Sequence, residues 1–153
     1  MSTEITPSRR ERRHRATLDE IVAVARSLLR EPGGISLRAV AQRMGMTAPA
    51  LYRYVDDLDA LMMLVADSID AETAATLRTA RDAHPEDDPV ARTVAAVAAF
   101  RHWALTRREE FSHVFANPAR SWHDDQPNEE CGLVLTELVV RIWEQYGFDV
   151  PAA

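Results

Sequence analysis

The chain has 153 residues, of which 46% are hydrophobic and 27% charged, a composition typical of a globular protein and unlike that of a disordered one. It contains no apolar run of about 18 residues, so no membrane span is predicted. The first 15 residues are polar and rich in arginine, unlike a secretory signal. The single cysteine, Cys131, can form neither an intramolecular disulfide nor a cysteine-based zinc site by itself. We therefore expect a cytoplasmic protein without a cofactor.

Charge is unevenly distributed along the chain. The formal net charge is −6, and all 18 basic residues are arginines. Residues 1–55 hold ten arginines and five acids, a balance of +5, whereas residues 56–153 have a balance of −11. A basic end beside an acidic body is expected where one end of a protein meets an anionic polymer, although a solubilising tail gives the same pattern.

The first third of the chain predicts three helices. Apolar residues at three- and four-residue spacing indicate helices over residues 17–31, 37–44 and 47–54. Thr17, with Glu20 three residues further on, is the predicted N-cap of the first helix. A Pro-Gly-Gly sequence ends this helix, because proline cannot continue the hydrogen-bond ladder and glycine adopts left-handed angles.

Four further helices are predicted in the remainder. The fourth begins at Asp57 or Asp59, and the others cover residues 90–107, a short segment around 111–115, and residues 133–146. Polar, proline-bearing loops separate the later helices. No period-two strand pattern and no internal repeat is evident, so the predicted fold class is all-α.

Residues 36–55 carry the pattern most informative about function. Two short helices joined by a tight turn at Gly45, with Ser36 and Thr47 as caps, fit a helix-turn-helix. In this motif the second helix presents its N-terminal residues to base edges in the major groove. Hydroxyls and arginines suit phosphates, and small apolar side chains allow close approach to thymine methyls. The candidate DNA-binding residues are Ser36, Arg38, Thr47, Ala48, Pro49, Ala50, Tyr52, Arg53 and Tyr54.

Structural roles compete for several of these residues. Tyr52 and Tyr54 can instead pack within the small domain. Arg38 and Arg43 can simply be solvated, although Arg38 also lies where it could meet a phosphate. The residues expected in the core, not in contact with DNA, are Leu37, Val40, Ala41, Leu51 and Val55.

A denser pattern surrounds this motif. Its members are Gly34, Ser36, Leu37, Ala41, Gly45, Met46, Pro49, Leu51-Tyr52, Tyr54-Val55 and Leu61. The pattern strongly resembles the DNA-binding domain of TetR-type (TetR/AcrR) transcriptional regulators. The resemblance covers residues 13–73, preceded by a basic flexible arm over residues 1–12 and followed by a helical effector-binding and dimerisation domain over residues 74–153.

The resemblance implies a homodimeric repressor that binds a palindromic operator in double-stranded DNA and releases it when a small effector binds. It also implies that the hydroxyl of Tyr52 contacts the DNA backbone, and that residues 47–50 and Tyr54 approach bases. One position departs from the family pattern. The family usually has a lysine where this chain has Leu58, flanked by three aspartates at positions 56, 57 and 59. These acids repel phosphate, so either the N-terminal arginines compensate or the affinity is modest.

The C-terminal half is less specific. Its aromatic residues resemble the effector domain of the same family and predict a pocket for an apolar or amphipathic effector, although a plain core is the alternative. The candidate pocket residues are Met62, Phe100, Trp103, Phe111, Phe115 and Trp122. His102, His113 and His123 match no closed set of ligands, so no metal is expected. Cys131 is expected to be a small buried residue.

Length is the second departure from the family. Such chains usually continue for several more helices, so the effector domain is expected to be shortened at its C-terminus. The helix over residues 133–146 is expected to form a dimer face or to cover the pocket. The leading hypothesis is a DNA-binding repressor; the others are a protein-interaction adaptor with weakened DNA binding and a small helical enzyme. The enzyme is disfavoured because no recognised catalytic spacing is present.

Overall fold

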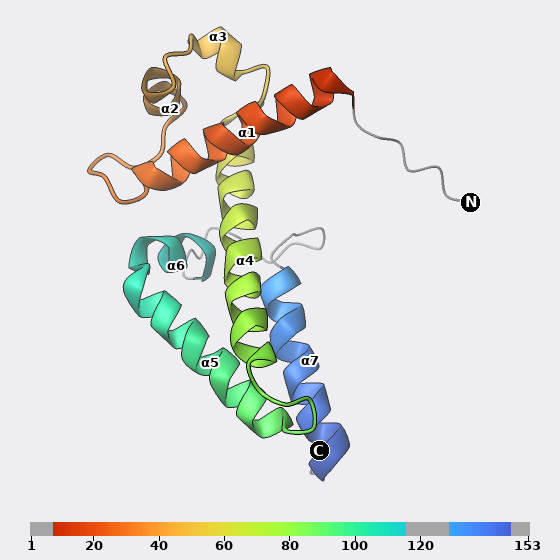
Figure 1. The fold of residues 1–153 in the computed structure, drawn as a ribbon. Coiled ribbons are helices and arrows are strands. Elements are labelled where there is room, and N and C mark those ends of the chain that lie inside the picture. Colours follow the sequence, from red (N-terminus) through yellow and green to blue (C-terminus); the bar gives the residue numbers. More distant parts are fainter. Residues whose placement is uncertain (1–7, 116–128, 148–153) are drawn as a thin grey trace, which may run out of the picture. The chain divides into compact units, whose positions relative to one another are not determined.

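The computed structural model describes residues 8–115 and 129–147. These residues form seven helices and no strand, which confirms the predicted all-α class (Figure 1). The chain divides into two compact units, unit 1 (residues 1–65) and unit 2 (residues 66–153). The long helix α4 (Leu58–Asp82) begins in unit 1 and continues in unit 2. The domain ranges given above remain a prediction.

Unit 1 contains α1 (Arg9–Leu28), α2 (Leu37–Arg43), α3 (Ala48–Leu51) and the first turns of α4. Helix α2 packs against both α1 and α3. The core of this unit consists of apolar side chains at the helical spacing that the sequence shows. Those that are almost completely buried are Ile21, Ala25, Val40, Leu51, Val55 and Leu61.

The start of α1 differs from the sequence prediction. Ser8, not Thr17, is the N-cap: its hydroxyl accepts the Glu11 N–H at 3.2 Å, and the Glu11 carboxylate accepts the Ser8 N–H at 2.6 Å. Thr17 lies inside the helix and donates its hydroxyl to the carbonyl of Arg13. Both Ser8 and Thr17 begin a capping-box sequence, and the arginine-rich residues between them are good helix formers, so the helix extends to the earlier cap.

This longer helix also shortens the expected arm. Residues 9–12, which were expected to be flexible, form the first turn of α1. Residues 1–7 lie outside the described part of the chain. The arginines at positions 9–15 therefore have fixed helical spacing, which is the spacing that decides which of them share a face.

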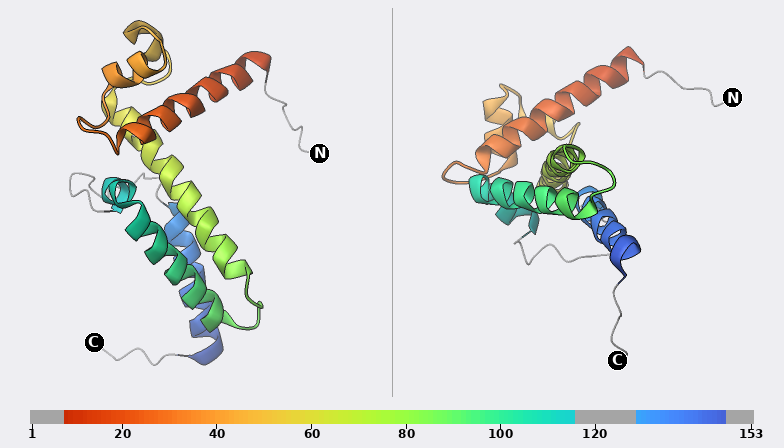
Figure 2. Two further views of the ribbon diagram at one scale, coloured as in Figure 1. Left: turned by 60° about the vertical axis from the view of Figure 1, so that its left-hand side comes forward. Right: turned by 60° about the horizontal axis from the view of Figure 1, so that its bottom comes forward.

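Unit 2 contains the rest of α4 together with α5 (Pro89–Thr106), α6 (Arg108–Phe115) and α7 (Glu129–Tyr146). Helix α5 packs against both α6 and α7, and α7 lies beside α4 (Figure 2). The core that these helices share consists of Ala74, Leu77, Ala96, Cys131, Val134 and Leu138.

A side chain of α4 caps the first turn of α7. Oδ2 of Asp70 accepts the backbone N–H of Glu130 at 3.1 Å and that of Cys131 at 3.3 Å. The first N–H groups of a helix have no partner within it, so this carboxylate satisfies two of them. Helix α7 begins four residues before the predicted start. The local sequence could not show this, because the residue that caps the first turn, Asp70, lies on α4.

Burial changes the titration of both Asp70 and Cys131. Burial raises the pKa of the Asp70 carboxyl, and the hydrogen bonds from the Cys131 and Glu130 N–H groups lower it in part. The thiol of Cys131 is buried, as predicted, and this burial raises its pKa to about 11. A thiol is a nucleophile only as thiolate, so Cys131 acts as a packing residue at neutral pH.

Candidate nucleic-acid interface

Helices α2 and α3 form the predicted helix-turn-helix. The Ser36 hydroxyl accepts the Ala39 N–H at 3.2 Å at the start of α2. The turn between the helices uses Gly45, whose φ of 64° lies in the left-handed region that glycine favours. Across this turn the N–H of Met46 donates to the carbonyl of Ala41 at 2.8 Å. The caps and the turn therefore fix the direction in which α3 leaves α2.

Helix α3 is shorter than predicted. Its α-helical part ends at Leu51, and the next residues form tighter i→i+3 hydrogen bonds, from the N–H of Arg53 to Ala50 and from that of Tyr54 to Leu51. The Thr47 hydroxyl accepts the Ala50 N–H at 3.4 Å at the other end. Residues 47–53 therefore form one α-helical turn followed by a tighter turn, a shorter recognition segment than the sequence predicts.

Most of the candidate DNA-binding residues are exposed on this segment. The side chain of Tyr52 is 52% exposed, so packing within the small domain does not account for it. The other exposed candidates are Arg38, Thr47, Ala48, Pro49 and Arg53, while Ser36, Ala50 and Tyr54 are half-buried. Val40, Ala41, Leu51 and Val55 are buried as predicted, and Leu37 is half-buried. The segment thus has a buried anchoring side and an exposed polar side.

Tyr54 has a partner within unit 1. Its ring stacks on that of His14 in α1, with the ring centroids 4.8 Å apart and the planes inclined by 18°. His14 was not among the predicted site residues. No local signal could have found it, because the two residues are 40 positions apart and only the packing of α1 brings them together. This stack joins the N-terminal half of α1 to the end of the helix-turn-helix.

The two arginines on α2 have different surroundings. Arg43 forms an ion pair with Glu31 at 2.8 Å, which holds it at the loop after α1. Arg38 lies near the start of α2 and is exposed. Of these two, only Arg43 has a carboxylate partner among the described residues.

The acidic start of α4 is partly occupied by capping. A carboxylate oxygen of Asp57 accepts the Ala60 N–H at 2.7 Å, at the positive end of the helix dipole. Asp56 and Asp59 are exposed, as is Leu58. This end of α4 offers no cation to a phosphate.

The candidate effector residues of unit 2 form an aromatic cluster. Phe100, Trp103, Phe111 and Phe115 contact one another ring to ring, with centroid distances between 5.5 and 6.4 Å. The indole Nε1 of Trp103 is buried and has no hydrogen-bond partner among the described residues. Trp122 lies outside those residues, and Met62 lies in unit 1.

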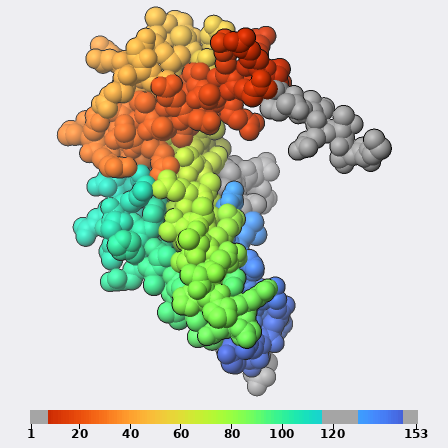
Figure 3. Space-filling view, viewed as in Figure 1, coloured from red at the N-terminus to blue at the C-terminus, as the bar shows by residue number. Residues whose placement is uncertain are grey.

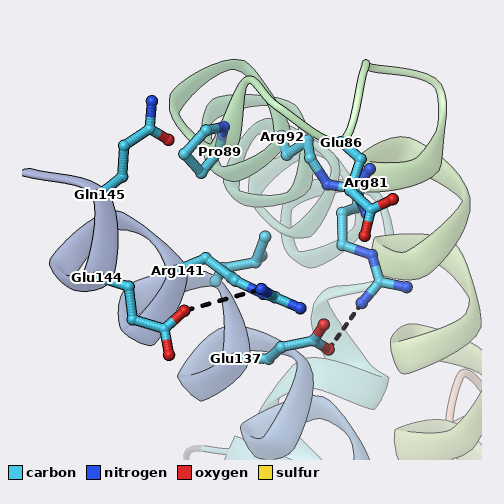
Figure 4. Close-up of a pocket in the computed structure, with 9 residues that line it drawn as sticks. Arg81, Glu86, Pro89, Arg92, Glu137, Arg141, Glu144 and Gln145 are labelled. Carbon is cyan, nitrogen blue, oxygen red and sulfur yellow. Dashed lines mark hydrogen bonds and ion pairs between the residues drawn. The ribbon is translucent and has the colours of Figure 1, made fainter.

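A separate cavity of about 250 Å³ lies among the end of α4, the start of α5 and α7 (Figure 4). Its polar lining includes Arg81, Arg92, Glu137 and Arg141, and none of the predicted effector residues lines it. Arg81 donates to Glu137 at 2.9 Å and also pairs with Asp82. The three arginines that line it are therefore each paired with a carboxylate.

The described residues contain neither a candidate metal site nor a candidate membrane span. No three histidine, cysteine or acidic side chains of that part of the chain lie close enough to share a metal ion. His123, one of the three histidines compared with metal-ligand patterns, lies outside it. No helix found there is long and apolar enough to cross a membrane.

Comparison with known proteins agrees with the helix-turn-helix. No family model matches the chain. The chain is 32% identical over 122 residues to the HTH-type transcriptional regulators Mb1846 of Mycobacterium bovis and Rv1816 of Mycobacterium tuberculosis. The match covers 78% of this chain and 51% of each relative, so the chain spans about half the length of these relatives.

A solved structure shows the same fold. The crystal structure of SCO4313, described as a regulatory protein, superimposes with a TM-score of 0.67 at 27% identity. The match covers 95% of this chain and 68% of that one. The chain is therefore a homologue of helix-turn-helix transcriptional regulators with an all-α regulator fold. These relatives are named as regulators and not as enzymes, in agreement with the sequence prediction.

Proposed function

We propose that this chain is a DNA-binding transcriptional regulator of the TetR type. The observation that carries the proposal is the exposed polar side of the α3 segment. Thr47, Tyr52 and Arg53 are exposed there, while Leu51 and Val55 anchor the segment in the core. A short element that is anchored on one side can bring its backbone close to base edges in the major groove. The similarity to named transcriptional regulators supports this proposal.

Each exposed group has a chemical role in this proposal. The phenolic hydroxyl of Tyr52 and the guanidinium of Arg38 bind phosphates, which fixes the position of the protein on the duplex. Arg53 binds guanine or phosphate, since its planar guanidinium matches both. The small side chains of Ala48 and Pro49 contact thymine methyls.

The proposal is tested by selecting bound fragments from genomic DNA and measuring their affinity by fluorescence anisotropy. Tyr52→Phe removes one hydroxyl and should weaken binding roughly fivefold, the equivalent of about 1 kcal/mol for one hydrogen bond. Tyr146→Phe is the matched control, because Tyr146 is similarly exposed but lies in unit 2. Equal effects of the two substitutions, or no binding by the unmodified protein at low salt, would contradict the proposal.

The proposal includes a homodimer, and α7 offers a face for it. Val139, Trp143 and Tyr146 follow one another at helical spacing and are 60%, 53% and 57% exposed, whereas Leu138 faces the core. Such an exposed apolar stripe is expected to be covered. Trp143→Glu should convert a dimer to a monomer in sedimentation velocity. A protein that is already monomeric at micromolar concentration would contradict this part.

The proposal also includes release of DNA by an apolar or amphipathic effector that binds at the aromatic cluster. The buried Nε1 of Trp103 supports this site, because a ligand oxygen would supply the acceptor that the described residues do not. Quenching of tryptophan fluorescence should accompany release of DNA, and Phe111→Ala should weaken both. An effector that releases DNA equally from Phe111→Ala and from the unmodified protein would place its site elsewhere.

A protein-interaction adaptor is the second candidate. The observation that favours it is the start of α4, where Leu58 is exposed between Asp56 and Asp59. A protein that does not bind duplex DNA at any salt concentration, yet is folded, would favour this candidate.

A further inference from the structure

We propose that a groove on unit 1, formed by the first turns of α1 together with Arg53 and Tyr54 after α3, extends the proposed DNA interface and binds the phosphodiester backbone without regard to sequence. The groove is lined by four arginines, Arg9, Arg10, Arg13 and Arg53, and by the rings of His14 and Tyr54. We call it the phosphate groove. The proposal rests on the proposed function, which supplies duplex DNA as the partner.

The phosphate groove joins two segments that are far apart in the sequence. Arg9, Arg10 and Arg13 come from the first turns of α1, and Arg53 comes from the tight turn after α3. The stack of His14 on Tyr54 lies between them and holds the two segments together. In the space-filling view the first turns of α1, in red, lie beside the yellow-orange segment of α2 and α3 (Figure 3).

Helical spacing selects the arginines of the groove. Arg9 and Arg13 are four residues apart and therefore lie on one face of α1. Arg12 and Arg15, on the same turns, do not line the groove. The earlier helix start, at Ser8, makes this arrangement possible, because a flexible arm over these residues would not hold the side chains in register.

The groove is an open hollow of about 1150 Å³, and it has the electrostatic character of an anion site. None of the described residues that line it is acidic. The four arginine side chains have no carboxylate partner in the described ranges, in contrast to Arg43, which pairs with Glu31. The nearby carboxylate of Glu11 is bound to the Ser8 N–H at the helix start.

The chemistry of guanidinium identifies the ligand. An arginine side chain is always charged and presents paired N–H donors that match two oxygens of a phosphate. The groove is open, not enclosed, and carries several cations in a row, which suits a polyanionic chain better than a single small anion. The acidic start of α4 cannot hold phosphate in this way, so unit 1 places its cations at the start of α1 instead.

The test compares two double variants of the same helix. Arg9→Ala/Arg13→Ala removes two charges from the groove, and Arg12→Ala/Arg15→Ala removes two charges from another face of α1. Alanine favours helix, and circular dichroism verifies that both variants fold. Affinity for the selected operator and for a scrambled duplex is measured by fluorescence anisotropy between 50 and 200 mM salt.

The groove variant should lose affinity roughly tenfold for both duplexes, and the slope of log K against log salt should decrease by about two. The control variant should change affinity less than about threefold, since its two charges lie outside the groove and act on the DNA through long-range attraction that salt screens. Equal losses in the two variants would overturn the phosphate groove and leave the proposed function intact. A protein that binds no duplex at all would overturn both.

A second measurement locates the contact on the DNA. Neutral methylphosphonates replace the backbone phosphates just outside each half of the operator. They should weaken binding of the unmodified protein and have no further effect on Arg9→Ala/Arg13→Ala, because both changes remove the same contact. Additive losses from the two changes would contradict the proposal.

Discussion

Units 1 and 2 use the same basic residue in different ways. In unit 2 the side chains of Arg78, Arg81, Arg92 and Arg107 each pair with a carboxylate at 2.9 to 3.0 Å. In unit 1 Arg43 is paired in the same way, but the arginines of the phosphate groove are not paired with any carboxylate in the described ranges. The number of arginines therefore does not determine whether a surface attracts anions. The position of the carboxylates does.

The two units also differ in how they bury apolar surface. In unit 1 the short, capped helices α2 and α3 lie over a small core. In unit 2 both α5 and α7 leave large apolar side chains exposed, among them Val94 and Val139. Substitutions in both units test these differences.

The largest effect is expected from the two faces of α7. Leu138→Ala should lower the free energy of unfolding by about 2–5 kcal/mol, because it leaves a cavity in the core of unit 2. Val139→Ala, one residue further on, should change it by less than about 0.5 kcal/mol if the exposed face is uncovered. Urea unfolding at low protein concentration measures both changes in the free energy of unfolding. A large loss for Val139→Ala that appears only at high protein concentration would show that a second copy covers this face.

The next largest loss of stability is expected from substituting Arg107, an ion-paired arginine of unit 2. Arg107 contacts Glu110, whose side chain is only 1% exposed, at 3.3 Å. Arg107→Ala should destabilise the protein by about 1–3 kcal/mol, because it removes a partner of a buried carboxylate. Arg13→Ala in the phosphate groove should change stability by less than about 0.5 kcal/mol. If thermal unfolding gives equal shifts for the two variants, the distinction between structural and available arginines fails.

Substitution of Asp70 is expected to lower the free energy of unfolding by up to about 1–2 kcal/mol, by an amount that depends on the new side chain. Asp70→Ala removes the cap of α7 and should destabilise the protein by that amount. Asp70→Asn keeps an oxygen that can accept both N–H groups, so its loss should be smaller. A result in which Asn is as harmful as Ala would show that the charge, and not the hydrogen bonds, matters.

The pH dependence of Asp70 follows from its raised pKa. Because burial raises the pKa of Asp70 in the folded protein, folding favours the protonated form. This contribution is fully present below the ordinary carboxyl pKa of about 4 and is lost as the pH rises through the raised value. The unmodified protein should therefore lose stability relative to Asp70→Asn over that range. A difference that stays constant from pH 3 to pH 7 would contradict the shift.

The smallest effects are expected from two glycines, one in each unit. Gly45, at a φ of 64°, should tolerate alanine poorly, with a loss of about 1 kcal/mol. Gly132 lies within α7 in open space, so Gly132→Ala should increase stability by up to about 1 kcal/mol. Opposite signs in thermal unfolding are the expected result. Stabilisation by Gly45→Ala would show that the turn of the helix-turn-helix is not held in the left-handed conformation.

Local signals were sufficient for much of unit 1. The hydroxyl caps at Ser36 and Thr47 and the turn at Gly45 depend on residues within three or four positions, and the structure confirms all three. The predicted start of α1, at Thr17, was wrong because Ser8 begins a second capping box and the residues between the two do not stop a helix. Where two capping sequences compete, the helix propensity of the residues between them decides at which one the helix begins.

Contacts between residues far apart in the sequence were not predictable. The stack of His14 on Tyr54, and the phosphate groove around it, join segments 40 positions apart. In unit 2 the aromatic spacing was compatible with either a core or a pocket, because both put rings on one face of a helix. The structure shows that these rings contact one another, and the effector site remains a proposal.

The cap of α7 by Asp70 has a consequence for the order of folding. The carboxylate and the N–H groups that it accepts are 60 and 61 positions apart, so the bond forms only after a long loop has closed. Contacts of such long range tend to be absent from the early stages of folding. Asp70→Ala should therefore accelerate unfolding and leave the folding rate nearly unchanged, the result expected if α7 docks after the transition state of folding.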